Sequence, residues 1–395
     1  MTPAPTRVAS LLAGRTGIGA HEVARLGPDT LLTLMRPGLE PRPPLLVNRE
    51  DEGLESMAVH QAIRPSAIAL IEDVTIHPGR YLVAGGAYVL ESLNNSILDT
   101  SMDLSGEHLP AEALLEAHRA AAMPTPRLIE EGERPYAWVT SFWSRNFGHW
   151  HIETLSALCL IEMAGIAVTP LFPPLSPWQR TSLLLAGWGP GRYVELPDLE
   201  PVRVARLVYP SPAWLFQGQA LDLFGIAPQL GGWVRRIATS VAARAPGRAM
   251  LPRRVFIRRS AGAAINRPLD NEAEVEAVFA ARGYTPVAPE TLAYEDQIRL
   301  FSGAERIAGA AGAAFALLPF VAPGTHVVQL CHREGWSYAW HAWSACFTAP
   351  RHFAYHEHPA RIAMQQGTGW KDVERWSIDV QRLGRVLGRL DAVWG

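Results

Sequence analysis

Short apolar runs alternate with segments of helical spacing along the second half of the chain. Between residues 254 and 330, the short runs are separated by stretches in which apolar residues recur every three or four positions. The first pattern predicts strands and the second predicts helices. The predicted strands are 254–258, 285–287, 306–308 and 326–330, and the predicted helices are 272–282, 294–304 and 313–320. This alternation predicts a parallel sheet with helices on both faces.

The first half of the chain has the same alternation after a β-rich opening segment. Residues 1–60, with the proline-rich stretch Pro41–Pro44, are expected to be irregular. Apolar patterning then predicts strands at 67–71, 74–76, 81–84, 87–90, 136–142, 166–171 and 193–196, and helices at 111–122, 147–164, 178–186 and 230–244. The fold class is therefore α/β throughout.

The length of 395 residues exceeds what one ordinary core holds. A linker with Pro and Gly is predicted at 244–252. We therefore predict an N-terminal domain at 1–245 and a C-terminal domain at 246–370. Residues 371–395 are predicted to form a docked helix, because apolar residues recur there at helical spacing with arginines between them.

Composition excludes several classes of protein. The 36 basic and 38 acidic residues give a net charge of −2, without the basic excess of a nucleic-acid-binding protein. Neither a signal-peptide pattern nor an apolar run long enough to span a membrane is present, and the three cysteines are widely spaced, so we expect a cytoplasmic protein. Lys371 is the one lysine, so the chain has no Walker A motif, and any phosphate held by side chains is held by arginine.

The segment Gly309-Ala-Ala-Gly312 is a candidate phosphate site. It lies between a predicted strand and a predicted apolar helix that starts at Ala313, where backbone N–H groups and the helix dipole favour anions. The alternative is that small residues here only allow close packing of helix and strand. Two arginines, Arg258 and Arg259, end the first strand of the same domain, and alternation along a strand predicts that one of them faces the site.

Three further polar residues are expected at the same edge of the sheet. Asn271 and Glu272 begin a predicted helix, where plain capping is the alternative role. Glu290 follows the next strand, and its carboxylate could bind the hydroxyls of a ribose or another sugar.

The segment Asn146-Phe-Gly-His-Trp-His-Ile-Glu153 carries the second candidate site. His149 and Glu153 are four residues apart and therefore share one helix face, as a general base and the carboxylate that orients it would. A core histidine is one alternative, and a metal site formed by His149, His151 and Glu153 is another. The group His352, His356 and His358 is expected at the surface. Trp336, Tyr338, Trp340 and Trp343 could stack on sugar rings or pack in a core.

Taken in order, these segments resemble the glycosyltransferase family 61 domain over roughly residues 60–350. Asn146–Glu153 is similar to the family's N-F-G-H-W-x-x-E segment. The C-terminal signature of the family is similar to Arg258-Arg259, Asn271-Glu272, Pro289-Glu290-Thr-Leu, Glu295-x-Gln297, Gly309–Ala313 and Phe320-x-x-Pro323-Gly324-Thr325.

The resemblance implies a GT-B fold, in which two Rossmann-like domains face a cleft. It also implies an inverting transferase without an obligatory metal, which moves a sugar from a nucleotide-sugar, expected to be a UDP-sugar, to a glycan or lipid-linked glycan of the cell surface, such as a capsular polysaccharide. The acceptor would bind the N-terminal domain, with His149 as base and Glu153 as its partner. The implied donor-binding residues are Arg258, Arg259, Asn271, Glu272, Glu290, Gly309, Ala311, Gly312 and Ala313.

One position departs from the family pattern. The family usually has G-x-H-G-A where this chain has Gly309-Ala-Ala311-Gly-Ala. The identity of the donor is therefore open, and a degenerate transferase that binds nucleotide or glycan without turnover is an alternative. Contact with the inner face of the membrane is also open, and the arginine-rich C-terminal helix is the candidate for it.

Overall fold

The computed structural model describes residues 7–9, 17–18, 31–33, 38–63, 67–77, 82–84, 87–89, 125–130, 132–196, 200–210, 230–244, 251–259, 268–332, 341, 344–345, 348, 350–358, 361–365 and 373–394. The predicted helix 111–122 and the four aromatic residues from Trp336 to Trp343 lie outside these residues. Contacts divide the chain into two compact units. Unit 1 is Met1–Leu39 with Ala62–Ala227, and unit 2 is Glu40–Gln61 with Pro228–Gly395.

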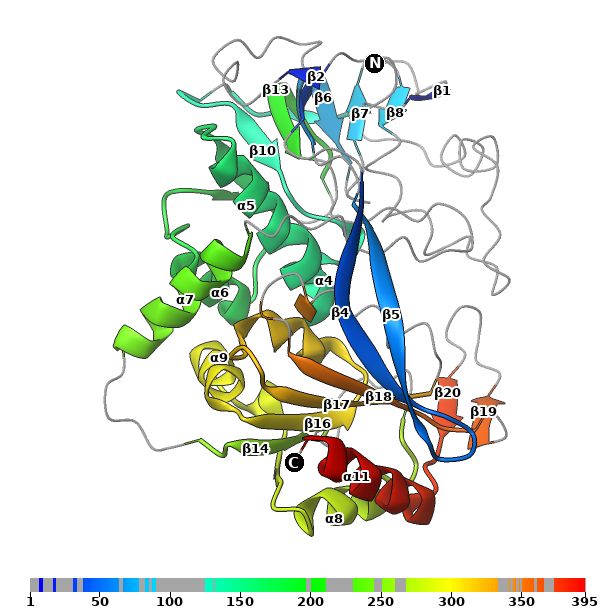
Figure 1. The fold of residues 1–395 in the computed structure, drawn as a ribbon. Coiled ribbons are helices and arrows are strands. Elements are labelled where there is room, and N and C mark those ends of the chain that lie inside the picture. Colours follow the sequence, from blue (N-terminus) through cyan, green and yellow to red (C-terminus); the bar gives the residue numbers. More distant parts are fainter. Residues whose placement is uncertain are drawn as a thin grey trace. The chain divides into compact units, whose positions relative to one another are not determined.

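Unit 1 is built on a mixed sheet with a parallel part (Figure 1). Its longest strands, β6 (Ala67–Ile76) and β13 (Val202–Pro210), pair antiparallel, and β13 also pairs in parallel with β10 (Tyr136–Trp138). The order of strands continues through β11 (Thr169–Phe172) to β12 (Val194–Glu195), both parallel. The remaining strands of the sheet are β1 (Arg7–Ala9), β2 (Gly17–Ile18), β3 (Leu31–Thr33), β7 (Leu82–Ala84), β8 (Ala87–Val89) and β9 (Arg127–Leu128).

The helices of unit 1 follow the predicted spacing closely. Residues 147–163 form a continuous helical run of α4 (Phe147–His149), η3 (Trp150–Leu155) and α5 (Ser156–Met163), and Gly165 ends it at φ 68°. Helix α6 (Pro177–Leu185) begins with a capping box between Ser176 and Gln179. The predicted strand 136–142 ends early, because residues 142–145 turn into a 3₁₀ segment, η2 (Phe142–Arg145). The second long strand, β13, was not predicted.

Unit 2 contains the predicted parallel sheet. Its order is β15-β14-β16-β17-β18-β4-β5, and β14 to β18 are all parallel. The strands are β14 (Arg254–Ile257), β15 (Thr285–Val287), β16 (Arg306–Ala310), β17 (His326–Cys331), β18 (Arg351–His356), β4 (Gly38–Asn48) and β5 (Leu54–Ile63). Outside it, β19 (Ile362–Gln365) pairs antiparallel with β20 (Val373–Trp376).

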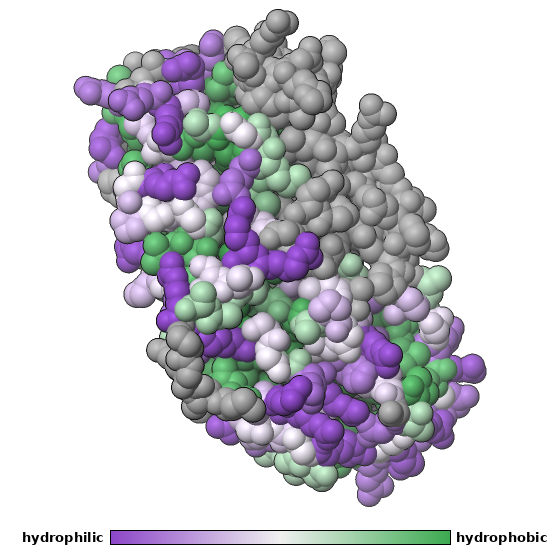
Figure 2. All heavy atoms as spheres, turned by 60° about the vertical axis from the view of Figure 1, so that its left-hand side comes forward, coloured by the Kyte–Doolittle hydropathy of each residue, from purple (hydrophilic) through white to green (hydrophobic). Residues whose placement is uncertain are grey.

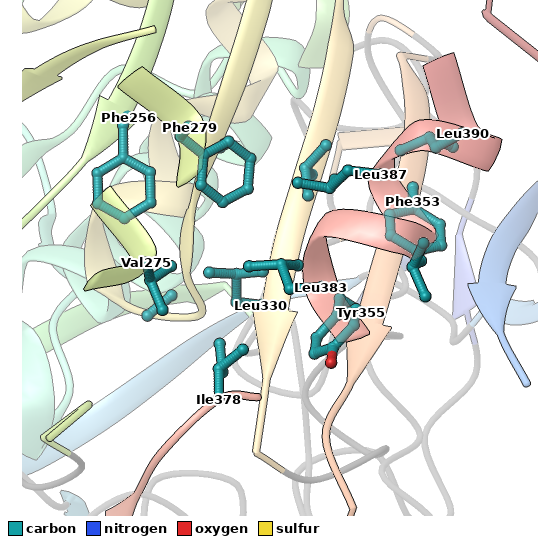
Figure 3. Packing of buried hydrophobic residues seen from close by; sticks show 14 of the residues in the cluster. Phe256, Val275, Phe279, Leu330, Phe353, Tyr355, Ile378, Leu383, Leu387 and Leu390 are labelled. Atoms are coloured by element: carbon teal, nitrogen blue, oxygen red, sulfur yellow. The ribbon is translucent and has the colours of Figure 1, made fainter. Parts of the chain in front are cut away.

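Helices are associated with this sheet on each side, as the pattern predicted. Side chains of α8 (Glu272–Ala280) and α11 (Val380–Trp394) pack with Phe256, Leu330 and Phe353 from three strands in one buried cluster (Figure 3). Helices α9 (Tyr294–Gly303) and α7 (Leu230–Arg244) contact each other and the 3₁₀ helix η5 (Ala313–Phe320). The fold is therefore mixed α/β and compatible with a Rossmann-like arrangement.

Four expectations about unit 2 need correction. Residues 38–48 and 54–63 are not irregular, because β4 pairs in parallel with β18. The apolar helix 313–320 is a 3₁₀ helix that contains Pro319, which lacks the N–H that an α-helix would use. His352 is not a surface residue: it is 3% exposed and bonds to Gln329, with 2.9 Å between His352 Nε2 and Gln329 Oε1. The predicted domain limits 1–245, 246–370 and 371–395 stay predictions, and hairpin β4–β5 and α7 are grouped with unit 2. The C-terminal helix is shorter than predicted, because residues 373–376 form β20 and α11 begins at Val380.

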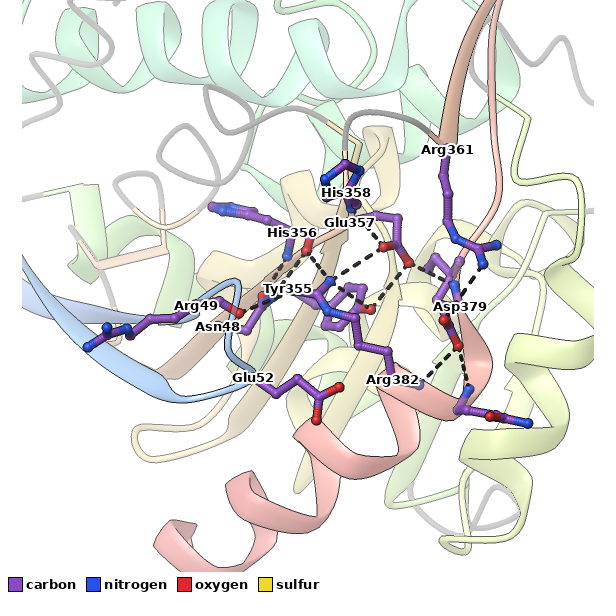
Figure 4. A network of polar contacts seen from close by, with 12 residues as sticks. Asn48, Arg49, Glu52, Tyr355, His356, Glu357, His358, Arg361, Asp379 and Arg382 are labelled. Carbon is purple, nitrogen blue, oxygen red and sulfur yellow. Dashed lines mark hydrogen bonds and ion pairs between the residues drawn. The ribbon is translucent and has the colours of Figure 1, made fainter.

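Helix α11 is attached to the rest of unit 2 by a polar network (Figure 4). Arg382 reaches the end of β18 and the β4–β5 turn, where its Nη2 donates to the carbonyl of Arg49 at 3.1 Å. The Asn48 carboxamide donates to the carbonyl of His356 at 3.0 Å and accepts its N–H at 2.7 Å. Helix α11 was the candidate for contact with the membrane. Its apolar side is buried in the core of unit 2.

Apolar side chains on the described surface are scattered. On the face in Figure 2 they form small patches among polar and charged residues. The large exposed apolar residues of the described part are Leu128, Met163, Leu184, Val194 and Val393. Single exposed apolar residues are normal for a globular protein. Within the described ranges, no helix combines the length and hydropathy needed to span a membrane.

Candidate functional site

The helical run that starts at Phe147 contains a π turn at its candidate site. Asn146 caps the run, and its side-chain oxygen accepts the N–H of Gly148 at 2.8 Å. The six residues of η3 are a π-helix and all are buried, including His151, Glu153 and Thr154. A π turn inside an α-helix is uncommon and is often found at functional sites. The buried polar side chains of this turn agree with that role.

His149 and Glu153 contact each other as the spacing predicted. Nδ1 of His149 lies 2.6 Å from Oε1 of Glu153. The His149 side chain is 29% exposed and that of Glu153 is 4% exposed. The second carboxylate oxygen, Oε2, accepts the hydroxyl of Ser141. We call these three residues the His149 cluster. It holds a partly exposed imidazole on a buried carboxylate, which is the arrangement of an oriented general base.

His151 has a different environment from His149. Its Nδ1 lies 2.7 Å from the carbonyl oxygen of Phe147, and its ring stacks with that of Trp178 at an interplanar angle of 4°. Burial lowers the pKa of His151 to about 4, which keeps the ring neutral at physiological pH. His151 is therefore a core histidine, and Glu153 has His149 as its partner instead. Among the residues that the structure describes, no group of three or more His, Cys, Asp or Glu could hold a metal ion.

The second site lies at the carboxyl ends of β14, β15 and β16 in unit 2. The chain runs from β14 through α8 to β15 on one side, and then through α9 to β16 on the other side of β14. The strand order therefore reverses between β14 and β16. In open α/β sheets, ligands bind at such a switch point, beyond the carboxyl ends of the strands.

A pocket of about 590 Å³ is present at this end of the sheet. We call it the arginine pocket. Both arginines of the pair line it. Their guanidinium groups have different partners, because that of Arg259 reaches Ala311 in the predicted phosphate turn and that of Arg258 lies beside Glu276. One arginine of the pair therefore faces the turn, as strand alternation predicted. The lining residues are Arg258, Arg259, Glu272, Ala273, Glu276, Pro286, Val287, Ala288 and Thr291.

Arg259 bridges the switch point. Its Nη2 donates to the carbonyl of Ala311 at 3.2 Å, and its backbone N–H donates to Glu272 Oε1 at 3.4 Å. Burial lowers the pKa of Arg259, and the carboxylates of Glu272 and Glu290 oppose this. The guanidinium stays charged, because the ordinary pKa of arginine is far above neutral. A partly buried cation at the carboxyl ends of a parallel sheet suits an anionic ligand such as a diphosphate.

The other pocket arginine is more exposed. Arg258 Nη1 lies 3.8 Å from Glu276 Oε2, and its side chain is 51% exposed. Glu272 is less exposed to solvent than Arg258, and burial raises the pKa of its carboxyl group. The pocket thus combines two guanidinium groups with two carboxylates of α8. Guanidinium groups bind phosphate, and carboxylates accept hydrogen bonds from sugar hydroxyls.

The glycines of the predicted phosphate turn have packing roles. A Cβ at Gly309 would lie 2.7 Å from the carbonyl oxygen of Ile257 on the neighbouring strand, so only glycine fits there. A Cβ at Gly312 would lie 3.0 Å from Nη2 of Arg259, so glycine leaves room for that side chain. The N–H of Ala311 donates to the carbonyl of Leu330 at 2.8 Å. This turn therefore shapes the surroundings of Arg259.

The remaining predicted donor residues lie outside the pocket lining. The carboxamide of Asn271 accepts the N–H of Ile378 at 3.0 Å and donates to its carbonyl at 2.8 Å. Asn271 precedes α8 as its N-cap residue, without a capping bond from its side chain. Glu290 is exposed on the 3₁₀ turn η4 (Pro289–Thr291), and Ala313 begins η5. Donor binding by these residues stays a prediction.

Ser141 and Glu276 are among the site residues that were missed in the sequence. Ser141 lies twelve residues before Glu153, a separation that no helix or strand periodicity connects. Glu276 follows Glu272 by four residues on α8, so the two share a helix face, and this spacing could have identified it.

Comparison with known proteins gives one result. No curated protein matches the chain. The family model described as Glycosyltransferase 61 matches residues 147–328, slightly less than half of the chain. The matched segment begins at the first residue of α4. It includes His149 and Glu153 but not Ser141, and it includes every residue that lines the arginine pocket. Residues 147–328 are therefore similar to glycosyltransferase family 61, and the match supports a glycosyltransferase.

Proposed function

We propose that this chain is an inverting glycosyltransferase that moves a sugar from a nucleotide-sugar to a hydroxyl group of a glycan acceptor. The observation that carries the proposal is the arginine pocket, which lies at the carboxyl ends of β14 and β15, within the matched segment. Its residue Arg259 reaches across the neighbouring switch point to Ala311. Two arginines there would bind the diphosphate and stabilise the charge that it gains on leaving. Glu272 and Glu276 would accept hydrogen bonds from hydroxyl groups of the donor.

The finer parts of the proposal follow the family resemblance. The donor would be a UDP-sugar, and the acceptor a glycan or lipid-linked glycan of the cell surface, such as a capsular polysaccharide. The enzyme would act in the cytoplasm, near the inner face of the membrane, and need no metal. The two units would correspond to the two domains of a GT-B enzyme, of which unit 2 would bind the donor.

His149 would act as the general base. Its Nδ1 contacts Glu153, so in the neutral ring with hydrogen on Nδ1 the lone pair is on Nε2. That nitrogen would take the proton of the acceptor hydroxyl. The acceptor oxygen would then form a bond to the anomeric carbon, while the bond from that carbon to the diphosphate oxygen breaks. Attack from the side opposite the leaving group inverts the anomeric configuration.

Nucleotide binding is the first test. The melting temperature of the protein would be measured with UDP, GDP, CDP and dTDP, and we expect UDP to raise it. Arg259→Gln should weaken UDP binding about 10- to 100-fold, because a charge-assisted hydrogen bond is worth about 1.5–3 kcal/mol. Arg253→Gln is the matched control, since this arginine precedes the opposite end of β14 and is 63% exposed. No shift with any of the four nucleotides would contradict the proposal.

Chemistry is the second test. UDP release from UDP-glucose, UDP-xylose and UDP-N-acetylglucosamine would be measured with and without EDTA, and the anomeric configuration of the product by proton NMR. We expect release in EDTA and an inverted product. His149→Gln should abolish release and keep the thermal shift with UDP, while His358→Gln, which changes an exposed histidine of unit 2, should leave both unchanged. A product of retained configuration would refute inversion.

A binding subunit without turnover is the second candidate function. The observation that favours it is Ala311, which carries no polar side chain and contributes its carbonyl to Arg259 instead. This function predicts the thermal shift with UDP but no release from any donor with any acceptor. The two tests together therefore distinguish an enzyme from a binding subunit.

A further inference from the structure

Ser141 supports the His149 cluster from outside the helical run. It follows strand β10, at the carboxyl end of that strand, and is 6% exposed. Its hydroxyl donates to Oε2 of Glu153, whereas Oε1 of the same carboxylate lies 2.6 Å from Nδ1 of His149. The two oxygens of one buried carboxylate therefore have two different partners, one from the loop after β10 and one from the helix.

The bond from Ser141 limits how Glu153 can turn. The terminal torsion of a glutamate side chain is broad, so a carboxylate held at one oxygen can rotate about that contact. A second hydrogen bond from a separate backbone segment restricts this rotation. It also supplies a donor to an oxygen that lies out of reach of bulk water, since the Glu153 side chain is 4% exposed. The orientation of the carboxylate in turn selects the nitrogen of His149 that carries hydrogen.

We infer that Ser141 is a positioning residue of the transfer reaction, which acts through Glu153 to hold His149 with hydrogen on Nδ1 and a lone pair on Nε2. The inference rests on the proposed function. Ser141 does not touch the reacting atoms in this scheme. The proton moves from the acceptor hydroxyl to Nε2 of His149, and Ser141 keeps its own hydroxyl hydrogen on Glu153 throughout.

Kinetics of matched serine variants test this role. Ser141→Ala should lower kcat for UDP release about tenfold, as expected for the loss of one hydrogen bond to a charged group, and change KM for the UDP-sugar less than about twofold. Ser141→Thr keeps the hydroxyl and should restore most of kcat. Ser156→Ala is the control, because Ser156 is 4% exposed on the same helical run and its hydroxyl contacts the carbonyl of His151. A purely structural role predicts equal losses for Ser141→Ala and Ser156→Ala, which would overturn the inference.

Histidine NMR gives a readout that does not require activity. In protein with labelled histidines, the signal of His149 is identified by its loss in His149→Gln. The wild type should show hydrogen on Nδ1 at neutral pH, and Ser141→Ala should show a mixture of both tautomers. An unchanged tautomer together with an unchanged kcat would refute the role of Ser141.

The kinetic and NMR experiments together distinguish a failure of this inference from a failure of the proposed function. If the wild type releases no nucleotide but the tautomer of His149 changes in Ser141→Ala, the proposed function fails and the positioning by Ser141 holds. If the wild type is active and neither kcat nor the tautomer responds to Ser141→Ala, the proposed function holds and the inference fails.

Discussion

The replacement Arg382→Ala should destabilise unit 2 more than any change at an exposed arginine of the same helix. The guanidinium of Arg382 lies inside the network of Figure 4. Its Nη1 donates to the carbonyl of His356 at 3.1 Å and contacts Glu357 Oε1 at 3.4 Å and Tyr355 Oη at 3.3 Å. The side chains of Arg382 and Glu357 are 15% and 1% exposed. Among the described partners of the Glu357 carboxylate, Arg382 is the one cationic side chain, and alanine would remove it.

The magnitude follows from what remains around Glu357. Breaking a buried ion pair by removing one partner typically costs about 3–5 kcal/mol. Glu357 would keep the backbone N–H donors of His358 and Asp379, each at 2.7 Å. These donors still stabilise the negative charge, so we expect the lower end of that range, about 3 kcal/mol in the free energy of unfolding. Arg382→Met should cost nearly as much, because the charge and its hydrogen bonds matter more than the aliphatic stem.

Arg385→Ala is the matched control on the same helix. Arg385 forms a bidentate pair with Glu52, with its Nη2 2.6 Å from Glu52 Oε1, but its side chain is 55% exposed. An exposed pair contributes at most about 1 kcal/mol. The free energies would be measured by urea unfolding followed by tryptophan fluorescence, with comparison of midpoints at equal slope.

One outcome would contradict the predicted loss of stability in Arg382→Ala. If Arg382→Ala loses no more stability than Arg385→Ala, the network does not carry the assigned energy. A further check is the double variant Arg382→Met with Glu357→Gln. It removes both charges and should recover part of the loss, because a buried pair replaced at both ends costs less than a buried charge left alone.

Three other predictions concern packing, pH and site assignment. Gly309→Ala should lower the free energy of unfolding by about 1–3 kcal/mol, because the added methyl group would press on the backbone of Ile257, and unchanged stability in urea would contradict this. The pKa of His151 is lowered from 6.5 to about 4, so the unfolded chain binds a proton first as the pH falls, and stability conferred by the neutral ring is present above pH 6.5 and is lost between about pH 6.5 and 4. Its size is about 3 kcal/mol, and His151→Gln should flatten that part of the pH–stability curve, whereas an equal slope in both proteins would refute the assignment. Asn271→Ala should lower stability by about 1–3 kcal/mol through the lost bonds to Ile378 and leave the affinity for UDP within about twofold, whereas weaker UDP binding at unchanged stability would support a donor-binding role.

Local patterns were sufficient for the regular part of unit 2 and for one contact in unit 1. The sequence predicted a helix at 272–282 with Asp270 or Asn271 as its cap and Gly283 just past its end. In the structure Asn271 is the N-cap residue of α8, and Gly283 has φ 78°. The alternation of short strands and helices predicted the parallel sheet, since such connections require a crossover. The spacing of His149 and Glu153 predicted their contact. Each of these features depends on residues that are close in the sequence.

Features that join distant segments were decided by the tertiary structure. Hairpin β4–β5 adds to the edge of a sheet formed some 300 residues later, where Asn48 pairs with the backbone of His356. Ser141 joins Glu153 from the loop after β10, and Arg259 reaches Ala311 beyond the end of β16. The physical reason is the same in each case. Periodicity and capping report the conformation of one segment, whereas burial, strand partners and the second hydrogen bond of a carboxylate depend on which segments meet when the chain folds.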